Sequence, residues 1–529
     1  MMTMKQHTAK LTILALAASL WACSDNWDKH YDNPDNVAGQ TVLELIQANP
    51  ELSKFARMIE IAGYDKLLGS SQTFTVFAPV DAALGDIDLD DVEQVKRLVA
   101  NHISRFSNSS STSAAQSVKM YNGKHFEFDG LNFGGSRLLT ADVVAKNGVL
   151  HTIASQLPYH YNLREYIDTH ASTSSIAAFI ARFDERKLDP EASVAVGVDD
   201  KGQTVYDSVL VNYNPIFDHK PYGLGSISAE DSVFTMIIPD NQAWAQAYER
   251  ISPYFKVYDP DQAVADSISE VQTSLAILGD LVYRREIHDP ASQQMLMSTS
   301  GSEISDPLAL FDGTSKIEAS NGLIYLAPRL NYDNVETWNK EIEVEGEVTA
   351  GRTPGAATSV NVRSVTAEHP LAARISEMRY IEVTPTSPTR QPSVTISIPD
   401  VLSGKYDIYV SMVPGNVIDS SAEADSTKLS FTLSYMGANG RIATKNFRSN
   451  DFVTKPTEMS LIKVAEAFEF PVSNFYDRLW YADELHSEGD RTNTTSLFIT
   501  TNVSAAEFNK NVFTRRFRLD RIIFVPIKN

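Results

Sequence analysis

The chain has 529 residues, of which 43% are hydrophobic and 21% are charged, a composition typical of a globular protein with about three domains. Its formal net charge of −21 argues against nucleic acid as a partner and against broad electrostatic binding to anionic lipid. Cys23 is the single cysteine, which excludes an internal disulfide, a cysteine metal site and a CxxC redox pair. Stability must therefore come from packed cores.

A short apolar segment precedes Cys23. Lys5 and Lys10 give a basic start, and residues 11–20 form an apolar run that is too short to span a bilayer of about 30 Å. This order, ending in Leu-x-Ala-Cys, resembles the signal of bacterial lipoproteins, although Trp21 stands where a small residue is usual. The resemblance implies a signal peptide over residues 1–22 and a Cys23 whose sulfur carries a diacylglycerol. The alternative is an ordinary signal peptide cleaved near Ala22.

Residues 23–38 are polar and acidic, which predicts a flexible tether between the lipid and the first folded module. From Cys23 to Gln40 the chain could extend at most roughly 55 to 60 Å at about 3.3 Å per residue. An acidic stretch after the lipidated cysteine also resembles the surface-export signal of Bacteroidetes lipoproteins. We therefore expect an outer-membrane protein, attached by its lipid and facing the cell exterior. No later stretch approaches 18 consecutive apolar residues, so no membrane helix is expected after Cys23.

The first predicted helices lie within residues 41–62. Thr41 and Glu44 have the spacing of a capping box, and Asn49 followed by Pro50 predicts a second helix start. Apolar residues then recur at helical spacing and predict one buried face: Leu52, Phe55, Ile59 and Ala62.

Strands and turns follow the predicted helices. Residues 73–79 are rich in β-branched and aromatic side chains and end at Pro79, which predicts a strand. Asp81 is expected to cap a short helix over residues 82–84. Asn147 and Gly148 predict a tight turn into a strand over residues 149–153.

The same plan returns later in the chain. Residues 162–183 predict a helical opening, and residues 232–239 predict a strand that ends at Pro239 and leads through Asp240 into another helix. Asn321 and Gly322 predict the turn into a strand over residues 323–326. Matching elements in matching order indicate an internal duplication.

The sequence TVFAPVDAAL at residues 75–84 and the sequence NGVLHTI at residues 147–153 resemble the two signatures of the fasciclin domain family. This resemblance implies two fasciclin-like α+β modules, at residues 39–158 and 159–330, each with a β-sandwich core and flanking helices. The second copy would carry an insertion at residues 184–228. The family is used for adhesion or ligand binding and usually lacks catalysis. We accordingly interpret the signature residues as structural: Phe77, Pro79, Leu150, Ile153, His102 and His151.

The last part of the chain, residues 331–529, changes to a period of two. Apolar and polar residues alternate around positions 394–398, 406–410 and 429–435, and proline or glycine separates these runs. The pattern predicts an antiparallel β-sandwich or jelly-roll. Residues 517–526 resemble the closing strand of galactose-binding-like modules.

A sugar site in this sandwich would need aromatic rings beside polar groups. The best candidates are close together in sequence: Phe475, Tyr476, Asp477, Trp480 and Tyr481. The alternative is a packed loop that covers the sandwich.

The sequence contains no HExxH, GxSxG, Walker or kinase motif, so we expect no enzyme and no cofactor. A D-x-D-x-D start at residues 86–90 fails as an EF-hand, because Asp91 replaces the glycine at position six and Arg97 replaces the glutamate at position twelve. No metal site is expected. The whole architecture resembles that of lipoproteins found beside SusC/SusD-type transporters, and this resemblance implies a non-catalytic surface lipoprotein that assists such an uptake complex in capturing glycan or peptide. The alternatives are a structural scaffold or cell–cell adhesin, and an unrecognised polysaccharide hydrolase.

Overall fold

The computed structural model describes residues 39–111, 114–188, 194–198, 204–207, 210–332, 337–417, 425–475 and 494–528. The chain divides into two compact units, Met1–Tyr161 and Asn162–Asn529. The expected signal peptide, Cys23 and the tether lie outside the described residues. No helix in the described ranges is both long enough and apolar enough to cross a membrane.

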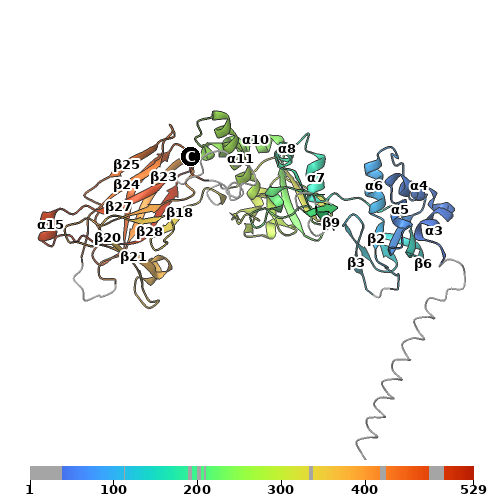
Figure 1. Ribbon diagram of the computed structural model, residues 1–529, viewed down its shortest axis with the longest axis horizontal. Coiled ribbons are helices and arrows are strands. Elements are labelled where there is room, and N and C mark those ends of the chain that lie inside the picture. The colour runs from blue at the N-terminus through green and yellow to red at the C-terminus, as the bar shows by residue number, and fades with distance from the viewer. Residues whose placement is uncertain are drawn as a thin grey trace, which may run out of the picture. The chain divides into compact units, whose positions relative to one another are not determined.

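In the described residues, the first module (residues 39–161) is a seven-stranded sheet with short helices against it (Figure 1, blue). Its helices are α3 (Val42–Ala48), α4 (Ser53–Ala62), α5 (Asp65–Leu68) and α6 (Val92–Ala100), with a 3-10 turn, η2 (Pro50–Leu52), before α4. Its strands are β1 (Phe74–Pro79), β2 (Ile103–Arg105), β3 (Gln116–Lys119), β4 (His125–Phe128), β5 (Asn132–Phe133), β6 (Ser136–Ala145) and β7 (Gly148–Ile153). The strand order is β2-β1-β7-β6-β5-β4-β3.

Local signals correctly predicted the start of the first module. Thr41 and Glu44 form the expected capping box at α3, and Asn49 accepts a hydrogen bond from the backbone of Glu51 at η2. The predicted face of α4 is buried, with Phe55 and Ile59 fully enclosed. The helix expected after Asp81 is wrong, because residues 81–83 form a turn. The Asp81 carboxylate instead accepts hydrogen bonds from Ser53 Oγ and from the Lys54 backbone N–H at the start of α4.

The second module (residues 162–332) opens with two helices, α7 (Leu163–Thr169) and α8 (Ser175–Ala181). Its longer helices are α10 (Asn241–Ile251) and α11 (Gln262–Gly279), and α12 (Pro307–Phe311) is a single turn. The described part of its main sheet has the order β13-β12-β17-β16, formed by β12 (Phe234–Pro239), β13 (Val282–Tyr283), β16 (Ser315–Ala319) and β17 (Gly322–Ala327). A small hairpin joins β14 (Leu296–Met297) to β15 (Glu303–Ile304).

Both modules place the Asn-Gly pair in the same parallel strand pairing. Phe74 of β1 lies opposite Gly148 of β7, and Phe234 of β12 lies opposite Gly322 of β17. In each glycine the backbone has a positive φ, and a Cβ atom would lie 1.8 Å from the carbonyl oxygen of the facing phenylalanine. Only glycine fits at such a close approach of two backbones.

The asparagine of each pair ties the sheet to the opening helix. Asn147 Oδ1 accepts a hydrogen bond from the Val42 N–H at 2.8 Å, and Asn321 Oδ1 accepts one from the Leu163 N–H at 3.0 Å. Each Nδ2 donates to two backbone carbonyl oxygens of a nearby loop. The duplication inferred from the sequence is therefore present as a shared hydrogen-bond pattern.

The segment expected as an insertion, residues 184–228, begins with two pairs of strands and ends in the core of the second module. β8 (Glu185–Leu188) pairs with β11 (Leu210–Tyr213), and β9 (Val194–Val198) pairs with β10 (Thr204–Asp207). The last part of the segment packs into the core of the module through α9 (Pro215–Asp218) and the loop after it. Its buried residues are Ile216, Phe217, Leu224 and Ile227.

The sandwich (residues 342–528) consists of antiparallel strands in two sheets (Figure 1, orange to red), as the alternating pattern predicted. One sheet has the order β20-β21-β28-β23-β26, with β18 also paired to β28, and the other has the order β19-β22-β27-β24-β25. The first contains β18 (Ile342–Glu345), β20 (Thr358–Ser364), β21 (Arg379–Pro385), β23 (Gly404–Met412), β26 (Ser460–Phe470) and β28 (Phe517–Pro526). The second contains β19 (Arg352–Pro354), β22 (Ser393–Ser397), β24 (Leu429–Met436), β25 (Ile442–Phe447) and β27 (Ser496–Thr501). The predicted fold class, α+β modules followed by an all-β sandwich, is confirmed.

Candidate functional site

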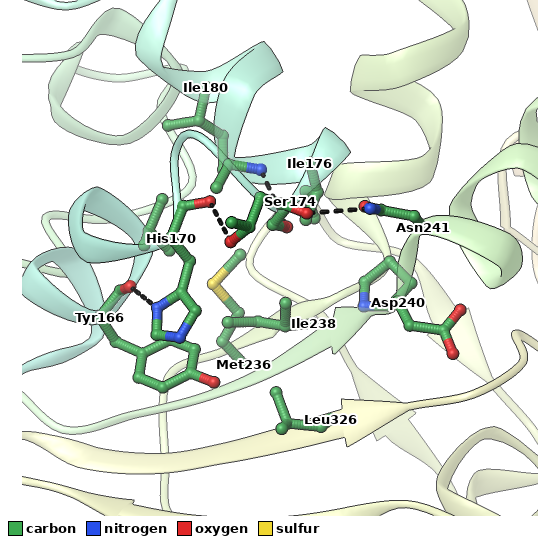
Figure 2. Close-up of a pocket in the computed structure, with 14 residues that line it drawn as sticks. Tyr166, His170, Ser174, Ile176, Ile180, Met236, Ile238, Asp240, Asn241 and Leu326 are labelled. Carbon is green, nitrogen blue, oxygen red and sulfur yellow. Dashed lines mark hydrogen bonds between the residues drawn. The ribbon is translucent and has the colours of Figure 1, made fainter.

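The second module contains an open apolar pocket of about 230 Å³. Figure 2 shows it between the two opening helices and the parallel strands β12 and β17. Its apolar wall is contributed by side chains from all four elements: Ile167, Ile176, Ile180, Met236, Ile238 and Leu326. The signature strand that forms the core in both modules thus also forms the floor of this pocket.

Capping interactions hold the helices that frame the pocket. Asn162 and Glu165 form a capping box at the start of α7, and the Ser174 side chain accepts a hydrogen bond from Ala177 N–H at the start of α8. Asn241 fixes the turn between these helices, because its Oδ1 accepts from the Ser175 N–H at 2.7 Å and its Nδ2 donates to the Thr173 carbonyl at 2.9 Å. The pocket rim is therefore tied to the start of α10 (Figure 2).

Two stacked rings form one side of the rim. Tyr166 and His170 lie with their ring centroids 4.2 Å apart and their planes inclined by 24°. His170 Nδ1 lies 2.7 Å from the Tyr166 carbonyl oxygen, which can only accept, so this nitrogen carries the hydrogen. Both rings come from α7 and its C-cap, and they are held in place before any ligand enters.

Two backbone N–H groups occupy equivalent places in the two modules, and the number of residues between them is the same in both. We use these two groups as anchors for comparing the modules. Val42 and Leu163 correspond, since each donates to the asparagine of its module. Lys54 and Ser175 also correspond, because their backbone N–H groups donate to the side chains of Asp81 and Asn241. Positions between these anchors can therefore be compared one by one.

Two residues that line the pocket are smaller than their counterparts in the first module. Thr173 corresponds to Leu52, and Ile176 corresponds to Phe55. Leu52 and Phe55 are both 0% exposed and belong to the first core. Thr173 is exposed, and its side chain is shorter than that of leucine. A polar residue at this position of the apolar pattern is the sequence signal for the pocket, and a search for catalytic and binding motifs does not detect it.

The pocket has the size of a binding site for one apolar group. A dry cavity of about 150 Å³ holds benzene, whereas pockets for whole small molecules occupy about 300 to 1,000 Å³. Its polar rim residues serve the local backbone, since Ser174 and Asp240 cap helices and His170 bonds to a carbonyl. Among the described residues, no side-chain hydrogen bond connects Ser174, His170 and Asp240. The arrangement therefore favours binding over nucleophilic chemistry.

Both signature-region histidines of the first module are buried and fully engaged. His102 Nδ1 donates to the Leu98 carbonyl at 2.8 Å, and its Nε2 accepts from the Leu157 N–H at 3.2 Å. Burial lowers the pKa of His102 to about 4, so the ring is neutral. Burial also lowers the pKa of His151, whose Nε2 donates to the Asn108 carbonyl at 2.9 Å. Their geometry is that of structural residues.

A tyrosine performs the role of His151 in the second module. Tyr325 OH donates to the Ile287 carbonyl at 2.6 Å. Asn108 and Ile287 correspond, because the backbone N–H of each donates to a strand threonine, Thr75 or Thr235. A different side chain thus closes the same hydrogen-bond network.

The structure describes one of the residues predicted for a sugar site. Phe475 is partly buried and contacts Phe255 edge to face at a centroid distance of 5.7 Å. Tyr476, Asp477, Trp480 and Tyr481 lie outside the described residues, as does Cys23. In the ranges that the structure describes, no group of three or more His, Cys, Asp or Glu side chains could hold a metal ion.

Part of the chain is similar to a known protein family. Residues 50–158 match the family model of the Fasciclin domain. This Fasciclin match covers most of the first module, and no curated protein matches the chain.

Solved structures also resemble the chain at low identity. A FAS1 domain pair from the insect cell adhesion molecule fasciclin I is 13% identical over 54% of this chain and 98% of that chain, with a TM-score of 0.20. The CBM22-1 xylan-binding domain from Paenibacillus barcinonensis is 14% identical over 36% of this chain and 94% of that domain, also with a TM-score of 0.20. Scores this low support no inference about a ligand.

Proposed function

We propose that this protein is a non-catalytic adhesion protein, anchored by a lipid on Cys23, whose second module binds an apolar side chain of a partner protein. The observation that carries the proposal is the open pocket on the second module, at the place that Leu52 fills in the first. The Fasciclin match over residues 50–158 supports a binding role.

The first module indicates which occupant fits. There a leucine side chain from the same chain occupies the corresponding place and is fully buried. A leucine-sized side chain from another protein would find similar surroundings in the second module. Protein interfaces commonly depend on a few such anchors in well-packed pockets, with near-neutral contacts around them.

Changing Thr173→Leu is expected to close the pocket from within. The new side chain would bury about two further carbons, which stabilises the second module by about 1 to 2 kcal/mol. Toluene, used as an apolar probe, should raise the melting temperature of the wild-type second module and leave that of the variant unchanged. Ser172→Leu is the matched control, because Ser172 is exposed and lies outside the pocket lining.

Equal toluene responses in the wild type and in Thr173→Leu would contradict the pocket as the binding site. Adhesion provides the second measurement, in which Thr173→Leu should reduce adhesion of the purified protein to bacterial cells while Ser172→Leu should not. Unchanged adhesion in Thr173→Leu would instead favour the scaffold function.

The anchor is tested by changing Cys23→Ser. A serine oxygen does not replace the thiolate nucleophile that accepts the diacylglycerol. We expect an unprocessed or released protein in place of one that fractionates with membranes. Fractionation followed by mass measurement of the N-terminal peptide checks this expectation. Membrane attachment that persists in the variant would contradict the lipid anchor.

The cell-surface location and a SusC/SusD-type partner are the further parts of the proposal. They rest on the resemblance of residues 1–38 to surface lipoprotein signals and on the adhesive modules, and the captured nutrient would be a glycan or a peptide. Recovery of a transporter barrel with the detergent-solubilised protein would support them. Recovery of the protein alone would favour a cell–cell adhesin without a soluble ligand.

A further inference from the structure

A second cavity, of about 520 Å³, lies within the unit Asn162–Asn529 and has a polar wall. It is bordered by α11, by the hairpin of β14 and β15 and by the segment that leads to the sandwich. Its polar lining includes Thr299, Ser300, Ser302, Thr337 and Lys340. Its volume falls within the range of about 300 to 1,000 Å³ that is usual for small-molecule sites.

A run of serines fixes the hydroxyl groups on one side. Ser298 Oγ and Ser300 Oγ lie 2.8 Å apart, Ser300 Oγ donates to the Gly279 carbonyl at 2.8 Å, and the Ser302 N–H donates to Ser298 Oγ at 3.1 Å. Ser300 thus uses its hydrogen within the protein, and the contacts of its oxygen with Ser298 Oγ and with Ser302 Oγ, 3.1 Å away, leave at most one lone pair for an entering donor. Hydroxyl groups held in this way are preorganised.

Further polar groups in the wall have unused hydrogen-bonding capacity. Among the described residues, Thr299 Oγ1 and Trp338 Nε1 are shielded from water and have no hydrogen-bond partner. An unsatisfied buried polar group costs about 1 to 3 kcal/mol, so such groups in a natural structure call for an explanation. Both atoms belong to residues that line the cavity, and a ligand would satisfy them once their side chains turn toward it.

Aromatic side chains complete the wall. Tyr222, Trp338 and Phe475 all line the cavity, and Phe475 is one of the aromatic residues predicted from the sequence to contact sugar. Ring faces beside fixed hydroxyl groups suit a ligand with an apolar C–H face and a rim of hydroxyl groups. The wall carries charges of both signs, Lys340 and Asp400, so it does not select a ligand with a net charge.

We propose that this cavity binds a neutral sugar of one or two rings. The site deepens the glycan-capture part of the proposed function, on which it rests, and does not depend on the apolar pocket. Serine and threonine hydroxyls would accept from the sugar, the Trp338 indole N–H would donate to it, and the aromatic side chains would pack against its C–H face.

Calorimetric titration with glucose, galactose, xylose and their β-1,4-linked disaccharides tests the proposal. We expect saturable binding of at least one of these probes to the full chain, and about tenfold weaker binding in Thr299→Val and in Trp338→Phe. Thr299→Val removes no hydrogen bond made within the described protein and should not lower the melting temperature, whereas Trp338→Phe trims a ring that packs against Tyr254 and Phe255 and should lower it slightly. A loss of affinity in Thr299→Val would therefore report on the ligand.

Thr173→Leu is the control that separates this site from the apolar pocket, and it should leave sugar binding unchanged. Absence of saturable binding of every probe would overturn the proposal. Sugar binding of equal strength in the wild type, Thr299→Val and Trp338→Phe would also overturn it, since the sugar would then occupy another place. Absence of a toluene effect in the wild type, together with retained sugar binding, would contradict only the adhesion proposal.

Discussion

Replacing Gly148 by alanine is expected to prevent the first module from folding. The added Cβ would lie 1.8 Å from the Phe74 carbonyl oxygen, and φ at this position is +148°, which side chains rarely tolerate. Relief of this clash requires separating β1 from β7 at the centre of the sheet. We expect a loss of more than about 4 kcal/mol, which exceeds the effect of most single substitutions.

Urea denaturation combined with limited proteolysis measures this effect. In Gly148→Ala, segments of the unit Met1–Tyr161 should be cleaved rapidly while the unit Asn162–Asn529 remains resistant. Gly85→Ala is the matched control, because Gly85 is exposed and its Cβ would meet no atom within 4 Å. A Gly148→Ala protein as resistant as the control would show that the parallel pairing is incorrect.

Replacing Asp280 by asparagine is expected to stabilise the second module at alkaline pH. Burial raises the pKa of Asp280 to about 7 from a usual value of 3.8, although hydrogen bonds from Ser302, Thr337 and Tyr332 and the charge of Lys340 oppose the rise. Between about pH 4 and pH 7 the folded state binds more protons at this site than the unfolded state. The free energy of unfolding therefore falls as pH rises through this window, by about 4 kcal/mol in total.

Thermal unfolding of wild type and Asp280→Asn from pH 4 to pH 8 tests this dependence. The variant should show a flatter profile and should exceed the wild type by several kcal/mol above pH 7, with the difference vanishing near pH 4. Asp266→Asn, at an exposed carboxylate on α11, is expected to follow the wild-type profile. Parallel profiles for wild type and Asp280→Asn would mean that Asp280 is solvated in the folded protein.

The parts of the fold that local chemistry determines were predictable. The capping box of Thr41 and Glu44 and the alternation of β24 depend on residues a few positions apart, and both are present. Asp81 was misassigned because its carboxylate bonds to Lys54, 27 positions earlier in the chain. From the sequence alone, residues 82–84 favour a short helix after Asp81. The tertiary structure shows that Asp81 instead caps the start of α4.

The apolar pocket was harder to predict, because it depends on the small size of side chains and not on any reactive group. Motif searches look for reactive groups, whereas the apolar pocket is lined by Thr173 where the first module has Leu52 and by Ile176 where it has Phe55. Comparing the two copies between their matching anchors would have revealed it. The polar cavity could not be anticipated, since its wall combines residues as distant in sequence as Tyr222, Thr299 and Phe475.

The position of β28 has a consequence for how the protein is made. This strand, Phe517–Pro526, lies inside its sheet and pairs with β18, β21 and β23, whose residues are synthesised more than a hundred positions earlier. Until β28 emerges, those three strands lack their common neighbour and expose unpaired edges that invite aggregation. The first module can fold as soon as its own residues are made, whereas the sandwich must wait for the last strand of the chain.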